Sequence, residues 1–193
     1  MKAFIVGNGV SRQGFDLEKL RGQGTIFGCN ALYRDFTPDY LVAIDDAIIS
    51  EINHAIDMGE CEVPQSKFIV PAWTECFEET TGNRSNAGMN AMVEAIKKDH
   101  TELYCLGFDF LIDDEISVAN IYDKTPCYGP ETRANRRDNI NRAAYMEYVA
   151  LQNRDVLFTF LFPRQEQPLR LLSVSADNVQ GMFYDAFEEK VLC

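Results

Sequence analysis

The 193-residue chain has no pair of cysteines with the C-x-x-C spacing. It has only two histidines, and its six cysteines are scattered (Cys29, Cys61, Cys76, Cys105, Cys127 and Cys193). Structural zinc sites and disulfide frameworks need such residues at short, repeated spacings. We therefore expect reduced thiols and no metal site, as is usual for a cytoplasmic protein.

Long apolar runs and positive charge are also scarce. No apolar stretch approaches the roughly 20 residues that cross a bilayer, and the first residues lack the pattern of a secretory signal. The chain has 18 Lys and Arg against 30 Asp and Glu, which gives a net charge of −12. A field of that sign repels nucleic acids and acidic membranes, so neither is expected as a partner. A small anionic ligand is still allowed, because local donors outweigh the global field.

Short apolar runs alternate with stretches of helical periodicity along the chain. Six strands are expected, at residues 3–6, 25–29, 40–44, 68–70, 103–106 and 156–162. Helices are expected at residues 15–20, 46–56, 89–96 and 140–151, the last with Ile140, Ala144, Tyr148 and Leu151 on its apolar face. Strands that alternate with helices form a parallel sheet with crossover connections. The sequence therefore predicts an α/β fold, a single Rossmann-like domain over residues 1–193 with a mainly parallel sheet flanked by helices.

Three segments have weaker patterns. Residues 72–85 are expected to form a loop. Residues 110–134 have no clear period, and an irregular stretch of this length is more often a functional lid or arm than filler. Residues 164–193 are interpreted as a C-terminal extension with edge strands near residues 169–174 and 182–184.

Glycine-rich and polar residues follow several of the expected strands. Ligands of parallel sheets bind at the carboxyl ends of the strands. The first turn, Gly7-Asn8-Gly9-Val10-Ser11, has glycines that leave room for a close ligand. Its amides are predicted to form an anion nest, with Ser11 as a further donor. A tight turn without a ligand explains the pattern equally well, since it is neither G-x-G-x-x-G nor a P-loop.

Other candidates have a functional and a structural interpretation. Asn30 offers an amide to a ribose or phosphate, or satisfies its own backbone. Asn86, with Gly88 after it, either caps the helix that follows or lies beneath a ligand. Asp45 and Asp46 either bind Mg²⁺, or Asp46 caps a helix. Arg133, near Arg136 and Arg137 and with Arg142 further on, either clamps a phosphate or belongs to a solvated basic face.

Several of these pieces, in this order, resemble the bacterial sialyltransferase family that modifies lipooligosaccharide, typified by the Campylobacter enzymes. The matching segments are Gly7-Asn8-Gly9-Val10-Ser11, Cys29-Asn30, Asn86-Ala87-Gly88, Gly107-Phe108-Asp109-Phe110 and Phe162-Pro163. The first motif is also similar to those of flagellin-modification accessory factors and archaeal pterin pyrophosphokinases. The sequence departs from the sialyltransferase pattern at Val10, Ala87 and Leu111, where that family has proline, serine and tyrosine.

The resemblance implies a metal-independent fold that binds a CMP-sugar and needs no other cofactor. Asn8, Gly9, Ser11 and Asn30, next to Gly7, would contact phosphate and ribose. Gly88 and the turn of Gly107, Phe108 and Asp109 would frame the cytidine, and residues 110–134 would be the acceptor lid. Tyr122 or Tyr128 would replace the family's phosphate-binding tyrosine.

The family's general base is a histidine after the lid, and residues 127–133 contain none. Acidic residues, Asp109 and Glu131 or else Asp45, are therefore predicted to deprotonate the acceptor. Two alternatives remain: a non-catalytic nucleotide-binding domain, and a pyrophosphokinase-like enzyme with Mg²⁺ at Asp45 and Asp46. The sequence leaves open whether copies assemble into a homo-oligomer.

Overall fold

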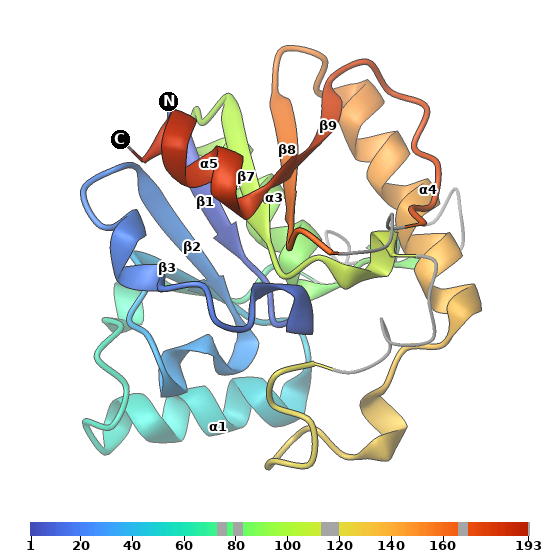
Figure 1. Ribbon diagram of the computed structural model, residues 1–193. Helices are drawn as coiled ribbons and strands as arrows, with labels where there is room; N and C mark the ends of the chain where they lie inside the picture. The colour runs from blue at the N-terminus through green and yellow to red at the C-terminus, as the bar shows by residue number, and fades with distance from the viewer. Residues whose placement is uncertain (73–76, 79–82, 113–119, 166–169, 193) are drawn as a thin grey trace.

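β1 (Lys2–Val6) lies at the centre of a seven-stranded sheet in which every neighbouring pair of strands is parallel (Figure 1). The computed structural model describes residues 1–72, 77–78, 83–112, 120–165 and 170–192. The strand order is β4-β3-β2-β1-β7-β8-β9. The other strands of this sheet are β2 (Thr25–Cys29), β3 (Tyr40–Val42), β4 (Phe68–Ile69), β7 (Glu102–Leu106), β8 (Leu157–Phe162) and β9 (Val179–Phe183). The predicted Rossmann-like α/β fold is confirmed.

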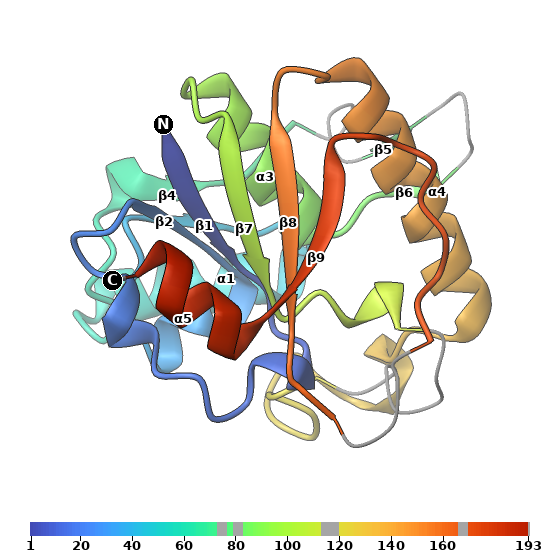
Figure 2. The same ribbon diagram turned by 45° about the horizontal axis from the view of Figure 1, so that its top comes forward.

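The central strands of the sheet are buried on both faces. In β1, Ala3 and Ile5 belong to one apolar core, and Phe4 and Val6 belong to the other. A strand covered on both faces needs a continuous apolar run, which is why this run was recognisable in the sequence. Side chains of α3 (Ala87–Lys97) and α4 (Arg136–Gln152) join the first core. Side chains of α1 (Asp46–Asp57) and α5 (Tyr184–Val191) join the second. In Figure 2, α5 lies in front of the sheet and α3 lies behind it.

The direction of strand addition reverses at β1. The chain adds β2, β3 and β4 on one side of β1, and then passes through α3 to add β7 on the other side. The turns after β1 and β7 therefore lie side by side, joined by a hydrogen bond from the Gly9 N–H to the Gly107 carbonyl (3.0 Å). Such a reversal opens a crevice at the carboxyl edge of a sheet, where ligands of this architecture bind.

Of the two edge strands expected within residues 164–193, the one near residues 182–184 is confirmed in part, and the one near residues 169–174 is not formed in the described residues 170–174. β9 is an integral parallel strand paired with β8, and Tyr184, expected in a strand, begins α5. Residues 170–174 form no strand beyond a single bridge between Ile112 and Leu171, and residue 169 lies outside the described part. Lys2 Nζ donates to the Val191 carbonyl (3.1 Å), so α5 ends beside the start of β1 (Figure 1).

The predicted apolar face of α4 is also wrong. Ile140, Tyr148 and Leu151 are exposed, and the helix instead buries Ala143 and Met146, among others. Both faces of this helix carry apolar residues, so the period alone does not decide which one packs on the sheet.

Smaller departures concern segment boundaries. The predicted third and fourth strands are shorter, since β3 ends at Val42 and β4 at Ile69. The expected helix at residues 15–20 is a 3-10 turn, Leu17–Leu20. The expected loop at residues 72–85 contains a short antiparallel pair, β5 (Phe77–Glu78) and β6 (Asn83–Arg84), and residues 73–76 and 79–82 lie outside the described part.

The described parts of the expected lid, residues 110–134, are irregular as predicted. Short 3-10 helices lie at Asp109–Leu111, where the segment begins, and at Pro130–Thr132. Residues 113–119 are not among the residues that the structure describes. Within the residues described, no helix combines the length and apolar character needed to traverse a bilayer.

Candidate functional site

A cavity of about 440 Å³ lies at the carboxyl edge of the sheet, where the strand order reverses. It brings together most of the residues predicted from the sequence to bind a ligand: Gly7, Asn8, Gly9, Asn30, Asn86, Gly88, Gly107, Phe108, Asp109 and Tyr128. Asp45, at the start of α1, also lines it. Residues that are far apart in the sequence therefore form one site, at the edge where the fold predicts it.

The amides of Gly7, Gly9 and Ser11 in the glycine-rich turn already have acceptors within the chain, which corrects the predicted nest. Gly7 N–H donates to Leu106 O (2.8 Å), and Gly9 N–H donates to Gly107 O. Ser11 N–H donates to the carboxylate of Asp109 (3.1 Å). The protein's own carboxylate thus takes the place in which a ligand phosphate was expected.

The close approach of Asp109 explains why a glycine occupies position 9. A Cβ atom on Gly9 would lie 2.4 Å from the Asp109 Cγ atom, a distance that real contacts do not reach. The Asp109 side chain is 5% exposed. Burial raises its pKa, and this is opposed by hydrogen bonds from Ser11 and Val10 and by the charge of Arg12. Asp109 therefore ties the β1 and β7 turns together.

Two asparagines present a different chemistry. The side-chain amide of Asn8 donates to the Cys29 carbonyl (3.1 Å), which directs its Oδ1 atom away from Cys29. The Oδ1 atoms of Asn8 and Asn30 are buried, and neither has a hydrogen-bond partner among the described residues. Buried polar atoms without partners are rare and costly. Both residues line the cavity, so two acceptor atoms of its wall lack a donor among the described residues.

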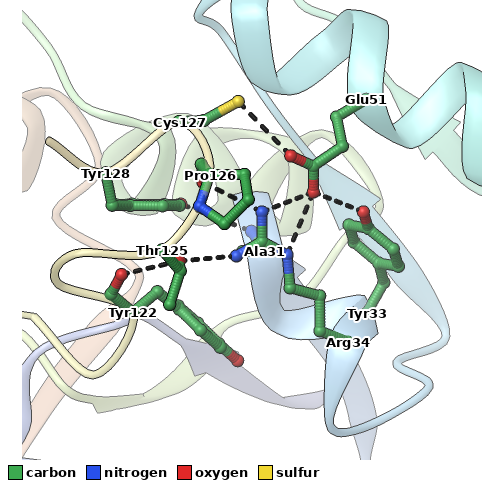
Figure 3. Close-up of polar contacts among 9 residues, drawn as sticks. All are labelled: Ala31, Tyr33, Arg34, Glu51, Tyr122, Thr125, Pro126, Cys127 and Tyr128. Carbon is green, nitrogen blue, oxygen red and sulfur yellow. Dashed lines mark hydrogen bonds and ion pairs between the residues drawn. The ribbon is translucent and has the colours of Figure 1, made fainter.

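Tyr128 lies beside these amides. Its hydroxyl accepts the Ala31 N–H at 3.4 Å (Figure 3). Burial raises the pKa of Tyr128 to about 12, against hydrogen bonds from Ala31 and from the side chains of Asn8 and Asn30. The phenol therefore stays protonated at neutral pH and keeps an O–H donor at the cavity wall.

An ion pair positions the segment that carries Tyr128. Arg34 pairs with Glu51 of α1, and it also donates to Thr125 Oγ1 (2.8 Å) and to the Pro126 carbonyl (3.0 Å) (Figure 3). The Arg34 guanidinium lies 5.8 Å from the Tyr128 ring centroid, within cation–π range. This part of the expected lid is thus fastened to the body of the protein.

Glu51 collects further donors in the same cluster. Its carboxylate accepts the Tyr33 hydroxyl (2.6 Å) and the Cys127 thiol (3.3 Å) (Figure 3). Burial on its own would raise the pKa of Glu51, but the hydrogen bonds from Tyr33, Arg34 and Cys127 outweigh it and lower the pKa. Glu51 is therefore ionised at neutral pH, and through Arg34 and Cys127 it holds the segment that carries Tyr128.

Asn86 is the N-cap residue of α3, one of the two roles expected for it: its side chain accepts the Met89 N–H (3.0 Å). Gly88 packs on Phe108: a Cβ atom there would lie 2.7 Å from the Phe108 ring. Both residues line the cavity, so the start of α3 is part of its wall.

Four predicted binding or catalytic residues lie outside the cavity lining, namely Ser11, Tyr122, Glu131 and Arg133. The Tyr122 hydroxyl donates to Asp35 (2.7 Å), and Arg133 forms an ion pair with Asp123. The Glu131 carboxylate folds back over Gly129, so close that a Cβ atom there would clash with it. The paired-acid site is not formed in the cavity either, because Asp46 lies within α1 while Asp45 lines the wall. Nor does Asp46 cap this helix: the N-cap residue is Asp45.

The sequence interpretation missed three polar residues of the lining, Asn120, Thr132 and Asn139, and named Arg142 only as the outlying member of the arginine cluster that either clamps a phosphate or is solvated. Asn120 forms a bridge with Gly9, and its Oδ1 accepts the Tyr122 N–H (2.8 Å). Asn139 and Arg142 are three residues apart on α4, on the side that faces the sheet edge. Polar residues within a helical pattern were the available signal, but only the fold shows that they face a cavity.

Among the described residues, no group of three or more His, Cys, Asp or Glu side chains is arranged to hold a metal ion. Comparison with known proteins adds no identification: no model of a protein family, no curated protein and no solved structure matches the chain.

Proposed function

We propose that the cavity binds a nucleotide-activated sugar, with a CMP-linked sugar as the expected ligand. The observation that carries this proposal is the lining: Asn8, Asn30, Asn86, Asn120 and Asn139 all border the cavity, in a chain whose net charge is −12. The volume of about 440 Å³ is within the range of small-molecule sites, roughly 300–1,000 Å³.

Carboxamides suit the hydroxyl-rich part of such a ligand. Each carboxamide offers both donors and acceptors without charge, as ribose hydroxyls and the edge of a base require. The buried Oδ1 atoms of Asn8 and Asn30 need donors, so we assign them to ribose hydroxyls or a base amino group rather than to phosphate. The resemblance of the Gly7–Ser11 and Cys29-Asn30 segments to the sialyltransferases favours cytidine as the base.

The associated reaction is transfer of the sugar to an acceptor hydroxyl, which needs a general base. Of the two carboxylates in the described lining, Asp109 is buried and tied to Ser11, and Asp45 is exposed. We therefore assign the base to Asp45. Loss of a general base lowers the rate by roughly 10²- to 10⁴-fold.

Binding is tested first with CMP, UMP, AMP, GMP and CMP-sialic acid in a thermal-shift panel, with and without Mg²⁺. A ligand at 100 times its Kd adds about 2.7 kcal/mol to the free energy of unfolding. We expect the largest shift from the cytidine ligands, independent of Mg²⁺. A shift that needs Mg²⁺ and a purine nucleotide would contradict the proposal and favour a pyrophosphokinase-like enzyme.

Asn30→Gly tests the lining directly. Asn30 has a φ of 50°, which glycine adopts without strain, so this variant removes the amide and keeps the backbone. Asp99→Gly is the matched control, because Asp99 has a φ of 63° and lies at the end of α3, away from the cavity. Weaker CMP binding in Asn30→Gly alone is expected; equal affinities in both variants would remove Asn30 from the site.

Turnover is tested by release of CMP from CMP-sialic acid. We expect Asp45→Asn to lower its rate roughly 10²- to 10⁴-fold, and the neighbouring Asp46→Asn, outside the lining, to preserve it. A non-catalytic binding protein is the second candidate, favoured because no histidine is among the described residues that line the cavity. Tight CMP-sugar binding without CMP release would establish that second candidate.

A further inference from the structure

Arg142 is the one Lys or Arg side chain among the described residues that line the cavity. It lies on α4, one turn after Asn139 and next to Ala143, both of which are buried. These neighbours fix the side of the helix from which Arg142 extends, and that side borders the cavity. The one cationic side chain of the described lining therefore comes from α4.

The guanidinium of Arg142 is poorly satisfied. Its one hydrogen bond within the described chain is 3.5 Å long, to Asn139 Oδ1, whereas ordinary N–H···O bonds are 2.7–3.2 Å. No described carboxylate lies within ion-pair distance of it, unlike Arg34, which pairs with Glu51. Burial lowers the pKa of Arg142, and the charges of Asp138 and Asp45 oppose this.

A half-buried guanidinium without an ion-pair partner is costly, and an oxyanion that enters the cavity offsets that cost. Arginine suits this task, because its planar fork matches phosphate and carboxylate oxygens with two parallel hydrogen bonds. The backbone amides that were expected to hold an anion are already bound to Leu106, Gly107 and Asp109. Arg142 is therefore the one cationic side chain that the described lining offers to a negatively charged group.

We infer that Arg142 binds the oxyanion of the cavity ligand, and so orients the ligand with its anionic group toward α4 and its hydroxyl-rich part toward Asn8 and Asn30. This inference rests on the proposed function. The oxyanion has two possible sources in an acidic nucleotide-sugar, the nucleotide phosphate and the carboxylate of the sugar. Both present the same paired oxygens, and the ligands chosen below distinguish them.

The test measures Kd by isothermal titration calorimetry for CMP, neutral cytidine and free sialic acid. The variants are Arg142→Gln, Arg142→Lys and the control Arg137→Gln, which removes the same charge from an exposed site on the same helix. Arg142→Gln is expected to weaken CMP binding about 10- to 100-fold, the effect of a lost hydrogen bond to a charged group. Cytidine binding is expected to stay unchanged, and Arg142→Lys to regain part of the loss.

If the loss instead affects sialic acid while CMP is unaffected, the sugar carboxylate occupies the position, and the inference still holds. Equal weakening of CMP and cytidine would show a structural role for Arg142 and overturn it, as would unchanged binding of both CMP and sialic acid. In these two cases the proposed function survives, because the wild-type protein still binds CMP. If the wild-type protein binds none of the three ligands, the proposed function and this inference both fail.

Discussion

The carboxylate of Asp109 accepts the backbone N–H of Ser11 at 3.1 Å, a contact between residues 98 positions apart in the sequence. It joins the turn after β1 to the turn after β7, at the point where the strand order reverses. The glycine-rich turn thus wraps around a carboxylate of its own chain. The cavity beside it owes its shape to this tie, and its ligand must find positive charge elsewhere.

Asp109→Ala is expected to destabilise the protein rather than to remove a ligand contact. Loss of the carboxylate leaves the buried Ser11 N–H without its acceptor, at a cost of about 1–3 kcal/mol. Urea unfolding at pH 7 measures the change, with the exposed Asp57→Ala at the end of α1 as control. Equal stability of the two variants would show that the tie contributes nothing.

We expect Glu51 to make the free energy of unfolding depend on pH at values below 4.5, the ordinary pKa of a glutamate. Its pKa is lowered from 4.5 in the folded protein, so the ionised form is preferred there. The stabilisation is therefore complete above about pH 4.5, the unfolded value, and is lost as the pH falls through the lower folded value. Wild-type protein should lose free energy of unfolding on acidification, and Glu51→Gln should lose less.

The control for this prediction is Glu18→Gln, which disrupts an exposed pair with Arg21. Exposed pairs contribute little, so this variant should follow the wild-type pH curve. At pH 7, Glu51→Gln should cost about 1–3 kcal/mol, because it leaves the half-buried Arg34 without its carboxylate. Parallel curves for wild-type and Glu51→Gln between pH 3 and 7 would contradict the role given to Glu51.

The central strands could be predicted from the sequence because burial on both faces demands an unbroken apolar run, as in Ala3–Val6. β9 was predicted only in part, as an edge strand near residues 182–184, because Gln180, Gly181 and Phe183 are exposed. Without two buried faces, its sequence loses the signal. α5 was missed for a related reason: it is short, and Phe187 is its one fully buried side chain.

The candidate site was likewise predictable in part: its location was, and its internal contacts were not. Its location follows from chain order, since turns after parallel strands share one edge, and so Asn8, Asn30 and Asp109 were predicted to meet. The partners within it depend on contacts between distant segments. No local sequence pattern indicates that Asp109 approaches Gly9 or that Arg142 lies on the side of α4 that borders the cavity. The sequence therefore predicted that the amides of the glycine-rich turn bind a ligand, whereas in the structure the Asp109 carboxylate accepts the Ser11 amide.

The cysteines should differ sharply in reactivity. Burial raises the pKa of Cys29 to about 12 and raises that of Cys105 well above its ordinary value, so both remain thiols at pH 8. Cys127 is partly exposed, and burial together with Glu51 raises its pKa. Iodoacetamide at pH 8, followed by peptide mass spectrometry, should label Cys127 slowly and leave Cys29 and Cys105 intact.

The same labelling in denaturant is the control, where all three thiols should react at similar rates. Since thiolates are the reactive form, the difference between the two conditions reports the folded environment. Rapid modification of Cys29 in the folded protein would contradict its placement within the sheet.

Phe187→Ala should reveal how much stability α5 contributes. Phe187 is fully buried, with ring centroids 5.9 Å from Phe4 and 5.3 Å from Tyr104. Truncating such a side chain costs about 3–5 kcal/mol, a large part of the roughly 5–15 kcal/mol that stabilises a domain. Phe183→Ala is the matched control, because Phe183 is 40% exposed at the edge strand and should cost under about 1 kcal/mol. Thermal unfolding should separate the two midpoints by about 10 °C. If the midpoints coincide, α5 does not pack on β1 and β7 as the structure places it.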